Sequence, residues 1–347
     1  MYETFFGLRE RPFELAPNPR FLLLTGRHTE ALGNLEYGIT GRKGLTLLLG
    51  EAGTGKTTVI RSALQKWQRA GHLVAYINNP TLTRDEFVEC LARAYGLGPD
   101  AASSKTRLLS ALTQLVMRRH GEGRITGLLI DEAQGLSDEL LEEIRLLANI
   151  ETTDAKVFPV VLAGQPELAL RLNGIHLRQL KQRIALRCVL SPLDLQETAA
   201  YIAGRIRLGG GVAGQLFTRE AVMAIHEHSR GIPRVINVIC DNVLLAAFAT
   251  NRRSASREMV EEVCRDFDLV SPDNVQPAAE RSALAVPVPA EPLAPSDAMT
   301  REGSVNTDSS MFASRARPEP SQESDAEIRR EPLFGRFAAR RRFSFFG

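Results

Sequence analysis

The chain has 347 residues, of which 44% are hydrophobic and 24% are charged, and its net charge is +2. These values are ordinary for a soluble globular protein, and the charge balance predicts neither a nucleic-acid nor a membrane partner. No apolar run approaches the ~20 residues of a spanning helix, and the first residues lack the basic lead and apolar core of a signal peptide. None of the four cysteines forms a C-x-x-C pair, which excludes zinc ribbons and thioredoxin-like sites. We therefore expect a cytoplasmic protein, unless a partner holds it at a membrane.

Residues 1–43 form an aromatic entry segment followed by a helix. Apolar residues at helical spacing predict the helix at 28–39. Phe5, Phe6 and Phe13 either belong to the core or lie over the base and ribose of the nucleotide that the next segment predicts. The sequence leaves both interpretations open.

A phosphate-binding loop follows, because residues 50–58 fit the pattern G-x-x-x-x-G-K-[ST]. Glycines let the backbone N–H groups turn toward phosphates, Lys56 reaches the β- and γ-phosphates, and the Thr57 hydroxyl is a ligand for Mg²⁺. An apolar run at 44–49 precedes the loop as a buried strand, and a helix follows it until Gly71, which is the order that the motif requires. The loop is Gly50-Glu51-Ala52-Gly53-Thr54-Gly55-Lys56-Thr57-Thr58.

An acidic pair completes the predicted nucleotide site. After a second strand at 73–77, a third apolar strand at 126–130 ends in Asp131 and Glu132. Asp131 is expected to hold Mg²⁺ through water, opposite Thr57, and Glu132 to polarise the water that attacks the γ-phosphate. An acidic pair after a strand is common by itself, but here it follows a phosphate loop. Helices are predicted at 84–95, 105–120 and 137–149.

Two further groups are candidates for the same site. A fourth strand at 158–165 ends at Gln165, which either positions the attacking water or caps a turn. A basic helix at 177–184 precedes a fifth strand at 185–190 and carries Arg178 and Arg183. One of them, with Arg183 preferred, is an arginine finger for a neighbouring subunit, or both belong to a solvated basic face.

Pro192 marks a domain boundary, because residues 193–268 show helical patterns and no strand pattern. Arg234 begins one of four predicted helices and either reaches the phosphates or is a surface arginine. Half of the 18 prolines lie in residues 269–347, which predicts a disordered tail. Its basic, aromatic end either contacts an anionic membrane surface, nucleic acid or a partner groove, or has no fixed ligand. The four helices are predicted at 195–207, 218–229, 234–250 and 256–267.

Over about residues 1–268 the chain resembles AAA+ ATPases of the general secretion pathway protein A type. The phosphate loop alone would indicate only the superfamily, whereas the N-terminal aromatic segment and Leu162-Ala163-Gly164-Gln165-Pro166-Glu167-Leu168 are specific to this family. By that resemblance, Lys56 and Thr57 belong to Walker A, Asp131 and Glu132 to Walker B, Gln165 is sensor 1, Arg183 is the finger and Arg234 is sensor 2. Further matching stretches are Phe6-Gly7-Leu8, Pro17-Asn18-Pro19-Arg20-Phe21, Leu129-Ile130-Asp131-Glu132-Ala133-Gln134, Gln182-Arg183-Ile184 and Gly231-Ile232-Pro233-Arg234.

The resulting fold class is α/β, with a five-stranded parallel sheet in the order 5-1-4-3-2 at residues 44–192 and a helical lid at 193–268. The resemblance implies ATP and Mg²⁺ as ligands, a homo-oligomer, and service to secretion, pilus or exopolysaccharide assembly. Such a protein is cytoplasmic or peripheral at the inner membrane. The fullest members also carry a membrane span and a peptidoglycan-binding domain, neither of which is expected here. The alternatives are a DNA-associated ATPase of transposition or loading type, although nucleic acid is not favoured, and a nucleotide-binding scaffold with little turnover.

Overall fold

The computed structural model describes residues 2–15, 23, 25–78 and 81–269. The stretch at 17–21 and, apart from Leu269, the predicted disordered tail with its basic, aromatic end fall outside the described residues. None of the helices in these ranges combines the length and the apolar character of a membrane span.

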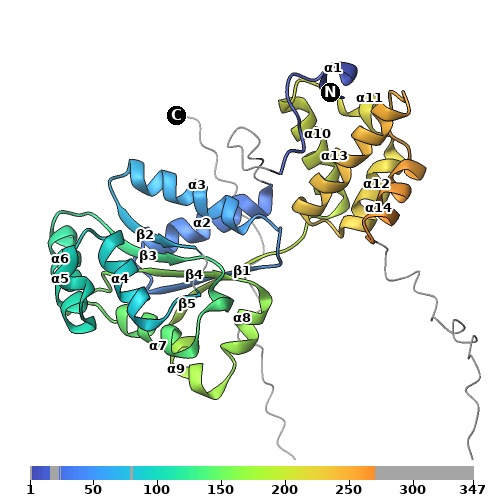
Figure 1. The fold of residues 1–347 in the computed structure, drawn as a ribbon. Coiled ribbons are helices and arrows are strands. Elements are labelled where there is room, and N and C mark those ends of the chain that lie inside the picture. The colour runs from blue at the N-terminus through green and yellow to red at the C-terminus, as the bar shows by residue number, and fades with distance from the viewer. Residues whose placement is uncertain (1, 16–22, 24, 79–80, 270–347) are drawn as a thin grey trace, which may run out of the picture. The chain divides into compact units, whose positions relative to one another are not determined.

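A five-stranded parallel sheet forms the centre of residues 44–192 (Figure 1). Its order, β2-β3-β4-β1-β5, confirms the predicted order 5-1-4-3-2. The strands β1, β3 and β4 are buried along their whole length, as expected for parallel strands that helices cover on both faces. The bounds are β1 Leu45–Gly50, β2 Leu73–Ile77, β3 Thr126–Ile130, β4 Val160–Gly164 and β5 Ile184–Leu190.

Helices cover both faces of this sheet, and alternate strand residues face opposite layers. The first layer is α2 (Gly26–Thr40) and α3 (Lys56–Arg69); the second includes α4 (Arg84–Ala94), α6 (Lys105–Gly121) and α7 (Asp138–Leu147). Leu48 and Leu129 pack with the first layer. Leu47 and Leu128 pack with the second. The apolar runs are thus buried on both sides, and polar residues concentrate where the strands end.

Several helices differ from their predicted bounds. The short helices α5 (Gly98–Ala102) and α8 (Pro166–Arg171) were not predicted. The basic helix predicted at 177–184 is a 3-10 turn, Ile175–Leu177, followed by α9 (Arg178–Gln182). It ends earlier than predicted because Ile184 pairs with Leu45 and already belongs to β5.

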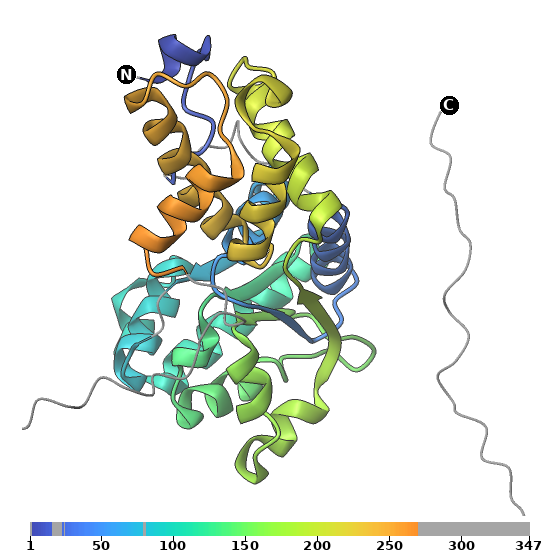
Figure 2. The ribbon, with the colours of Figure 1, turned by 90° about the vertical axis from the view of Figure 1, so that its right-hand side faces the viewer.

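The C-terminal helices form a second apolar cluster, which also contains the start of the chain (Figures 1 and 2). Phe13 is 0% exposed, and its ring lies 6.2 Å from the ring of Phe217 at a steep angle. The structure therefore shows Phe13 as a core residue, whereas Phe5 and Phe6 are half-buried. The helices are α1 (Tyr2–Phe6), α10 (Leu195–Leu208), α11 (Ala213–Leu216), α12 (Arg219–Ser229), α13 (Pro233–Ala249) and α14 (Arg257–Asp266).

Candidate active site

The sheet topology collects the predicted site residues at one edge. The strands β3, β4 and β1 are neighbours and run parallel, so their carboxyl ends lie side by side. Asp131 follows β3, Gln165 follows β4, and Gly50 ends β1. Ligands of open α/β sheets bind at this edge.

The phosphate loop has the shape that anion binding requires. Gly55 has φ +103°, a conformation that favours glycine, and the next residue begins α3. Lys56 is 4% exposed, and its Nζ donates to the carbonyls of Gly50 at 2.8 Å and Glu51 at 3.1 Å. An ammonium has three N–H donors, so one remains for a phosphate. The positive end of the α3 dipole points at the same place.

Burial lowers the pKa of Lys56, and the nearby carboxylates of Glu132 and Asp131 oppose this effect. The two largest opposing charges are those of the acidic pair, so the phosphate loop and the acidic pair interact electrostatically. A phosphate bound beside Lys56 would further favour the charged ammonium.

Asp131 is the buried centre of the acidic pair. It is 0% exposed, and its Oδ2 accepts a hydrogen bond of 2.8 Å from the Thr57 hydroxyl. The Tyr76 hydroxyl also donates to Oδ2, at 3.3 Å, and burial together with this carboxylate raises the pKa of Tyr76 to about 12. The backbone N–H of Glu132 donates to Oδ1 at 3.0 Å. Thr57 and Asp131 thus place two hard oxygen donors together, a set that suits Mg²⁺.

Glu132 is held by two glutamine side chains. Its Oε2 accepts from Nε2 of Gln134 at 2.5 Å and from Nε2 of Gln165 at 3.5 Å. Gln134 in turn accepts the backbone N–H of Gln165 at 3.1 Å, while Arg171 donates to the Gln134 carbonyl at 2.8 Å. The sequence predicted Gln165 at this site but gave no role to Gln134 or Tyr76.

The three predicted arginines occupy different places. The backbone N–H of Arg234, at the start of α13, donates to the Gly53 carbonyl at 3.3 Å, so the structure brings this residue to the phosphate loop. Arg183 donates to the Asn149 side chain and lies at the amino end of β5, the opposite edge from Asp131. Arg178 is exposed at the start of α9. Neither Arg178 nor Arg183 joins the phosphate loop of its own chain.

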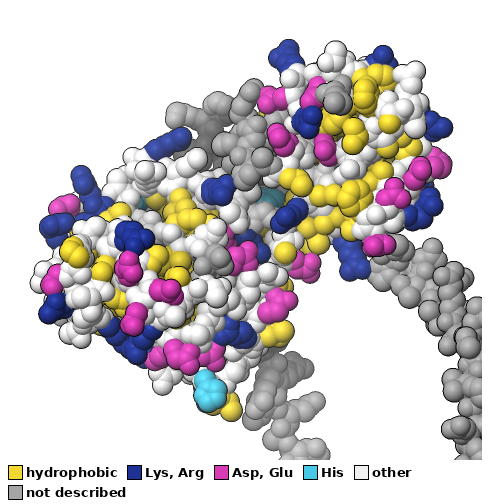
Figure 3. Space-filling model, in the orientation of Figure 1, with side chains coloured by type: hydrophobic (Ala, Val, Ile, Leu, Met, Phe, Trp, Pro, Cys, Tyr) yellow, Lys and Arg dark blue, Asp and Glu magenta, His cyan; other side chains and the backbone are white. Residues whose placement is uncertain are grey.

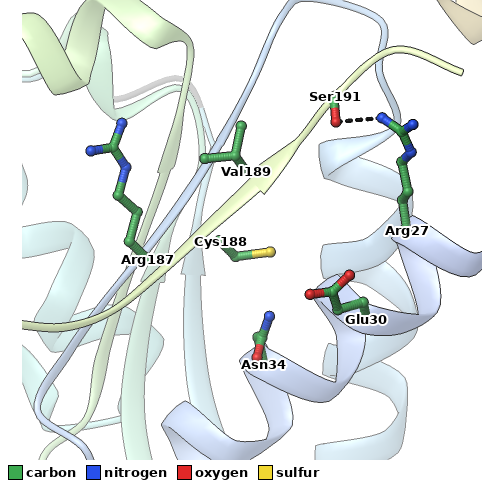
Figure 4. Close-up of a pocket in the computed structure, with 7 residues that line it drawn as sticks. All are labelled: Arg27, Glu30, Asn34, Arg187, Cys188, Val189 and Ser191. Carbon is green, nitrogen blue, oxygen red and sulfur yellow. Dashed lines mark hydrogen bonds between the residues drawn. The ribbon is translucent and has the colours of Figure 1, made fainter. Parts of the chain in front are cut away.

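A separate cavity of about 230 Å³ lies between α2 and β5 (Figure 4). Arg27, Asn34 and Cys188 are among its lining residues, and Arg27 donates to the Ser191 hydroxyl at 2.6 Å. None of the predicted site residues lines it.

Residues 39–172 match the family model described as an AAA domain. The chain carries an AAA domain. Its sequence is 43% identical over 249 residues to General secretion pathway protein A of Aeromonas hydrophila. The aligned region covers 72% of this chain and 45% of that protein. The predicted resemblance to this family is therefore confirmed, although the chain spans less than half of the relative's length.

The AAA fold is also seen in solved structures. Cdc6p from Pyrobaculum aerophilum matches with a TM-score of 0.57 and 20% identity, covering 74% of this chain and 70% of that one. The Aeropyrum pernix ORC2 protein, solved as ADPNP-ADP complexes, matches with a TM-score of 0.53 and 18% identity, covering 74% and 71%. At these identities the likeness shows the fold alone.

The AAA domain match contains the phosphate loop, the acidic pair and Gln165. Arg183 and Arg234 lie beyond its end at residue 172. AAA domains are nucleotide-binding domains of the ATPase class, and the geometry at the carboxyl edge of this sheet is compatible with that class.

Proposed function

We propose that the chain binds ATP with Mg²⁺ and hydrolyses it to ADP and phosphate. The observation that carries the proposal is the hydrogen bond of 2.8 Å between Thr57 and the buried Asp131 carboxylate. It joins the start of the phosphate-loop helix to the end of β3, where nucleotidases hold their metal. ATP is preferred to GTP because of the family resemblance.

In this proposal the loop from Gly50 to Thr58 binds the phosphates through its backbone N–H groups and the Lys56 ammonium. Thr57 and Asp131 would hold Mg²⁺, directly or through water. Within the described ranges no group of three or more His, Cys, Asp or Glu side chains forms a metal site. Mg²⁺ keeps several waters and shares its coordination with substrate phosphates, so it would need only a few protein oxygens here. When bound, the ion neutralises charge on the phosphate oxygens.

Glu132 would act as the base that orients the attacking water. The water oxygen forms a bond to the γ-phosphorus, the bond from that phosphorus to the bridging oxygen of ADP breaks, and the carboxylate accepts the water's proton. Gln134 and Gln165 hold Oε2 of Glu132, which limits the directions in which it can accept. Gln165, whose Nε2 lies 3.5 Å from Oε2 of Glu132, would also help to orient the water.

The two remaining arginines would act from outside the loop. Arg234 would sense the phosphates from the helical lid, since α13 begins against Gly53. Arg183 would complete the site of a neighbouring copy as an arginine finger, because it lies at the amino edge of its own sheet. This arrangement makes the proposed active form a homo-oligomer.

The client is proposed from the relative's name. General secretion pathway protein A suggests that this AAA domain serves a secretion or envelope-assembly machine, as a cytoplasmic protein or one bound peripherally at the inner membrane. A DNA-associated role is less well supported. On the face drawn in Figure 3, basic and acidic side chains are interspersed rather than gathered into one basic patch. Salt-dependent DNA binding would favour that alternative.

Nucleotide binding tests the proposal at its first step. Calorimetric titration of the full chain with ATP and Mg²⁺ should give saturable binding, which Lys56→Ala should weaken at least about tenfold through loss of a buried charged contact. Lys66→Ala, an exposed lysine near the end of the same helix, is the matched control and should bind as the wild type does. Absence of binding by the wild type would overturn the proposal.

A further inference from the structure

His28 is a buried histidine whose ring lies against the phosphate loop. It stands in the first turn of α2 and is 4% exposed. One ring nitrogen, Nδ1, lies 2.7 Å from the Thr25 hydroxyl and 3.4 Å from the Thr25 backbone N–H. The other, Nε2, lies 3.0 Å from the carbonyl oxygen of Thr54, inside the loop. The ring therefore bridges the start of α2 and the phosphate loop.

The partners of His28 determine which nitrogen carries the proton. A backbone N–H can only donate, so Nδ1 accepts from Thr25 and Nε2 carries the hydrogen. Nε2 then donates to the Thr54 carbonyl, which can only accept. Burial lowers the pKa of His28, which agrees with a neutral ring that uses both nitrogens.

The contact with Thr54 controls the direction of a neighbouring N–H group. In a planar trans peptide, the carbonyl of Thr54 and the N–H of Gly55 point in opposite directions. When His28 holds the carbonyl, the Gly55 N–H points away from α2. The preceding carbonyl, that of Gly53, is held in the same way by the backbone N–H of Arg234. Two consecutive carbonyls of the loop are thus fixed from outside.

The fit between His28 and the loop also depends on Gly55. A Cβ atom at this position would lie 2.5 Å from Nε2, which is closer than a real contact allows. The ring occupies the space that a side chain at Gly55 would need, so loop and ring are matched in shape.

We propose that His28 is a positioning residue for nucleotide binding, which holds the phosphate loop in its binding shape through the Thr54 carbonyl. This inference rests on the proposed function. Without the contact, the loop samples other shapes, and binding must restore the correct one. The free-energy cost of restoring the binding shape applies equally to the bound substrate and to the transition state. KM should therefore rise while kcat stays nearly unchanged.

A purely structural role is the competing explanation, and two variants separate it from positioning. His28→Asn retains an acceptor near Thr25 but is too short to reach Thr54. His28→Gln places an amide N–H donor near the position of Nε2. If the ring only caps α2 and fills space, the glutamine variant should bind nucleotide no more tightly than the asparagine variant. If it positions the loop, the glutamine variant should recover most of the affinity.

The test is calorimetric titration of the full chain with ADP and with ATP, together with steady-state ATP turnover and thermal melting. We expect H28N to raise Kd and KM about tenfold with kcat within about twofold, and H28Q to stay within about threefold of the wild type. Thr40→Ala is the matched control, because Thr40 is exposed at the other end of α2 and its hydroxyl donates to the Glu36 carbonyl of the same helix.

Two results would overturn the inference: H28N binding within twofold of the wild type, or a folded H28Q binding as weakly as H28N. If H28N does not fold, H28Q decides alone, since a tenfold loss in folded H28Q contradicts positioning. Failure of the wild type to bind either nucleotide would instead reject the proposed function, and the inference with it.

Discussion

Glu132 has a backbone conformation that a glutamate rarely adopts, with φ +54°. Such a conformation costs about 1–3 kcal/mol and persists only where neighbouring contacts impose it. The hydrogen bond from its N–H to Asp131 and the two glutamine contacts do so here. These contacts hold the Glu132 carboxylate just after β3, where its charge favours the charged form of Lys56 in the phosphate loop.

Gln134→Ala tests whether this support matters for chemistry. Loss of the 2.5 Å contact should leave Glu132 less well oriented, so we expect kcat to fall about tenfold while nucleotide affinity stays within about twofold. Steady-state ATP turnover and titration with ATP measure the two quantities. A variant with unchanged kcat would show that Gln165 alone positions Glu132.

His28 should also make stability depend on pH. The pKa of His28 in the folded chain lies below the ordinary value of about 6.5, because burial disfavours the charged ring, although the hydrogen bond to Thr54 and the charge of Glu197 favour it. Between the two pKa values the unfolded chain binds more protons, so the free energy of unfolding falls on acidification through this window. Above about pH 7, the contribution of His28 to the free energy of unfolding should be constant.

Urea unfolding at about pH 7.5 and 5.5 measures this dependence. The pKa of His72 is also lowered by burial, but His72 contributes the same pH dependence of stability to the wild type and to His28→Asn. The difference between the two proteins in stability lost on acidification therefore reports His28 alone. We expect the wild type to lose more stability on acidification than His28→Asn does. Equal losses of stability in the two proteins would mean that His28 takes up a proton as readily in the folded chain as in the unfolded chain.

Local motifs made part of this site predictable from sequence. Lys56, Thr57 and Asp131 belong to short patterns in which neighbouring residues already specify the chemistry. The contacts of Tyr76 with Asp131 and of His28 with Thr54 join positions 55 and 26 residues apart. No local pattern reports such pairs, so they required the structure.

At the scale of elements, the five strands were predictable because each is an apolar run that parallel packing buries. The short helices α5 and α11 were not, because four or five residues show no helical period. A contact inside the lid was also invisible in the sequence. The backbone N–H of Leu193, at the start of the lid, donates to the Gly231 carbonyl just before α13 at 2.8 Å.

Gly231→Ala should break the contact between Leu193 and Gly231. Gly231 has φ +71°, and a Cβ atom there would lie 1.9 Å from the Leu193 carbonyl oxygen. The left-handed conformation alone costs alanine about 1–2 kcal/mol, and the collision must also displace backbone. We expect a lower melting temperature by calorimetry.

Gly214→Ala is the matched control, because a Cβ atom there meets nothing within 4 Å. It should melt at the wild-type temperature or slightly above, since alanine favours helices. If both glycine variants melt alike, the contact between Gly231 and Leu193 does not stabilise the lid.

At the scale of the whole molecule, the proposed homo-oligomer is inferred from Arg183 acting as a finger in another copy. Arg183 lies at the edge of the sheet opposite the phosphate loop of its own chain, so a finger role for it would have to be at the site of another copy. We propose the boundaries at residues 43, 192 and 268 as the limits of the entry segment, the core and the lid. In that division the finger belongs to the core and Arg234 to the lid.

Turnover per subunit should therefore rise with protein concentration, and Arg183→Ala should abolish the rise without loss of ATP binding. A finger contributes about 10³-fold or more to turnover in related chemistry. Lys181→Ala is the control, because it removes an exposed positive charge only two residues before Arg183. Flat turnover, or a silent Arg183→Ala, would contradict assembly through this residue. An effect of Arg178→Ala alone would transfer the role to Arg178.

Hydrolysis through Glu132 is tested by comparing wild type and Glu132→Gln in one preparation series, by ATP titration and by phosphate release with Mg²⁺. We expect Glu132→Gln to bind ATP within about threefold of the wild type and to release phosphate about 10²–10³-fold more slowly, because an amide cannot accept the water's proton. Equal phosphate release by the two proteins would contradict this expectation, since the chain would then not use this carboxylate to hydrolyse ATP.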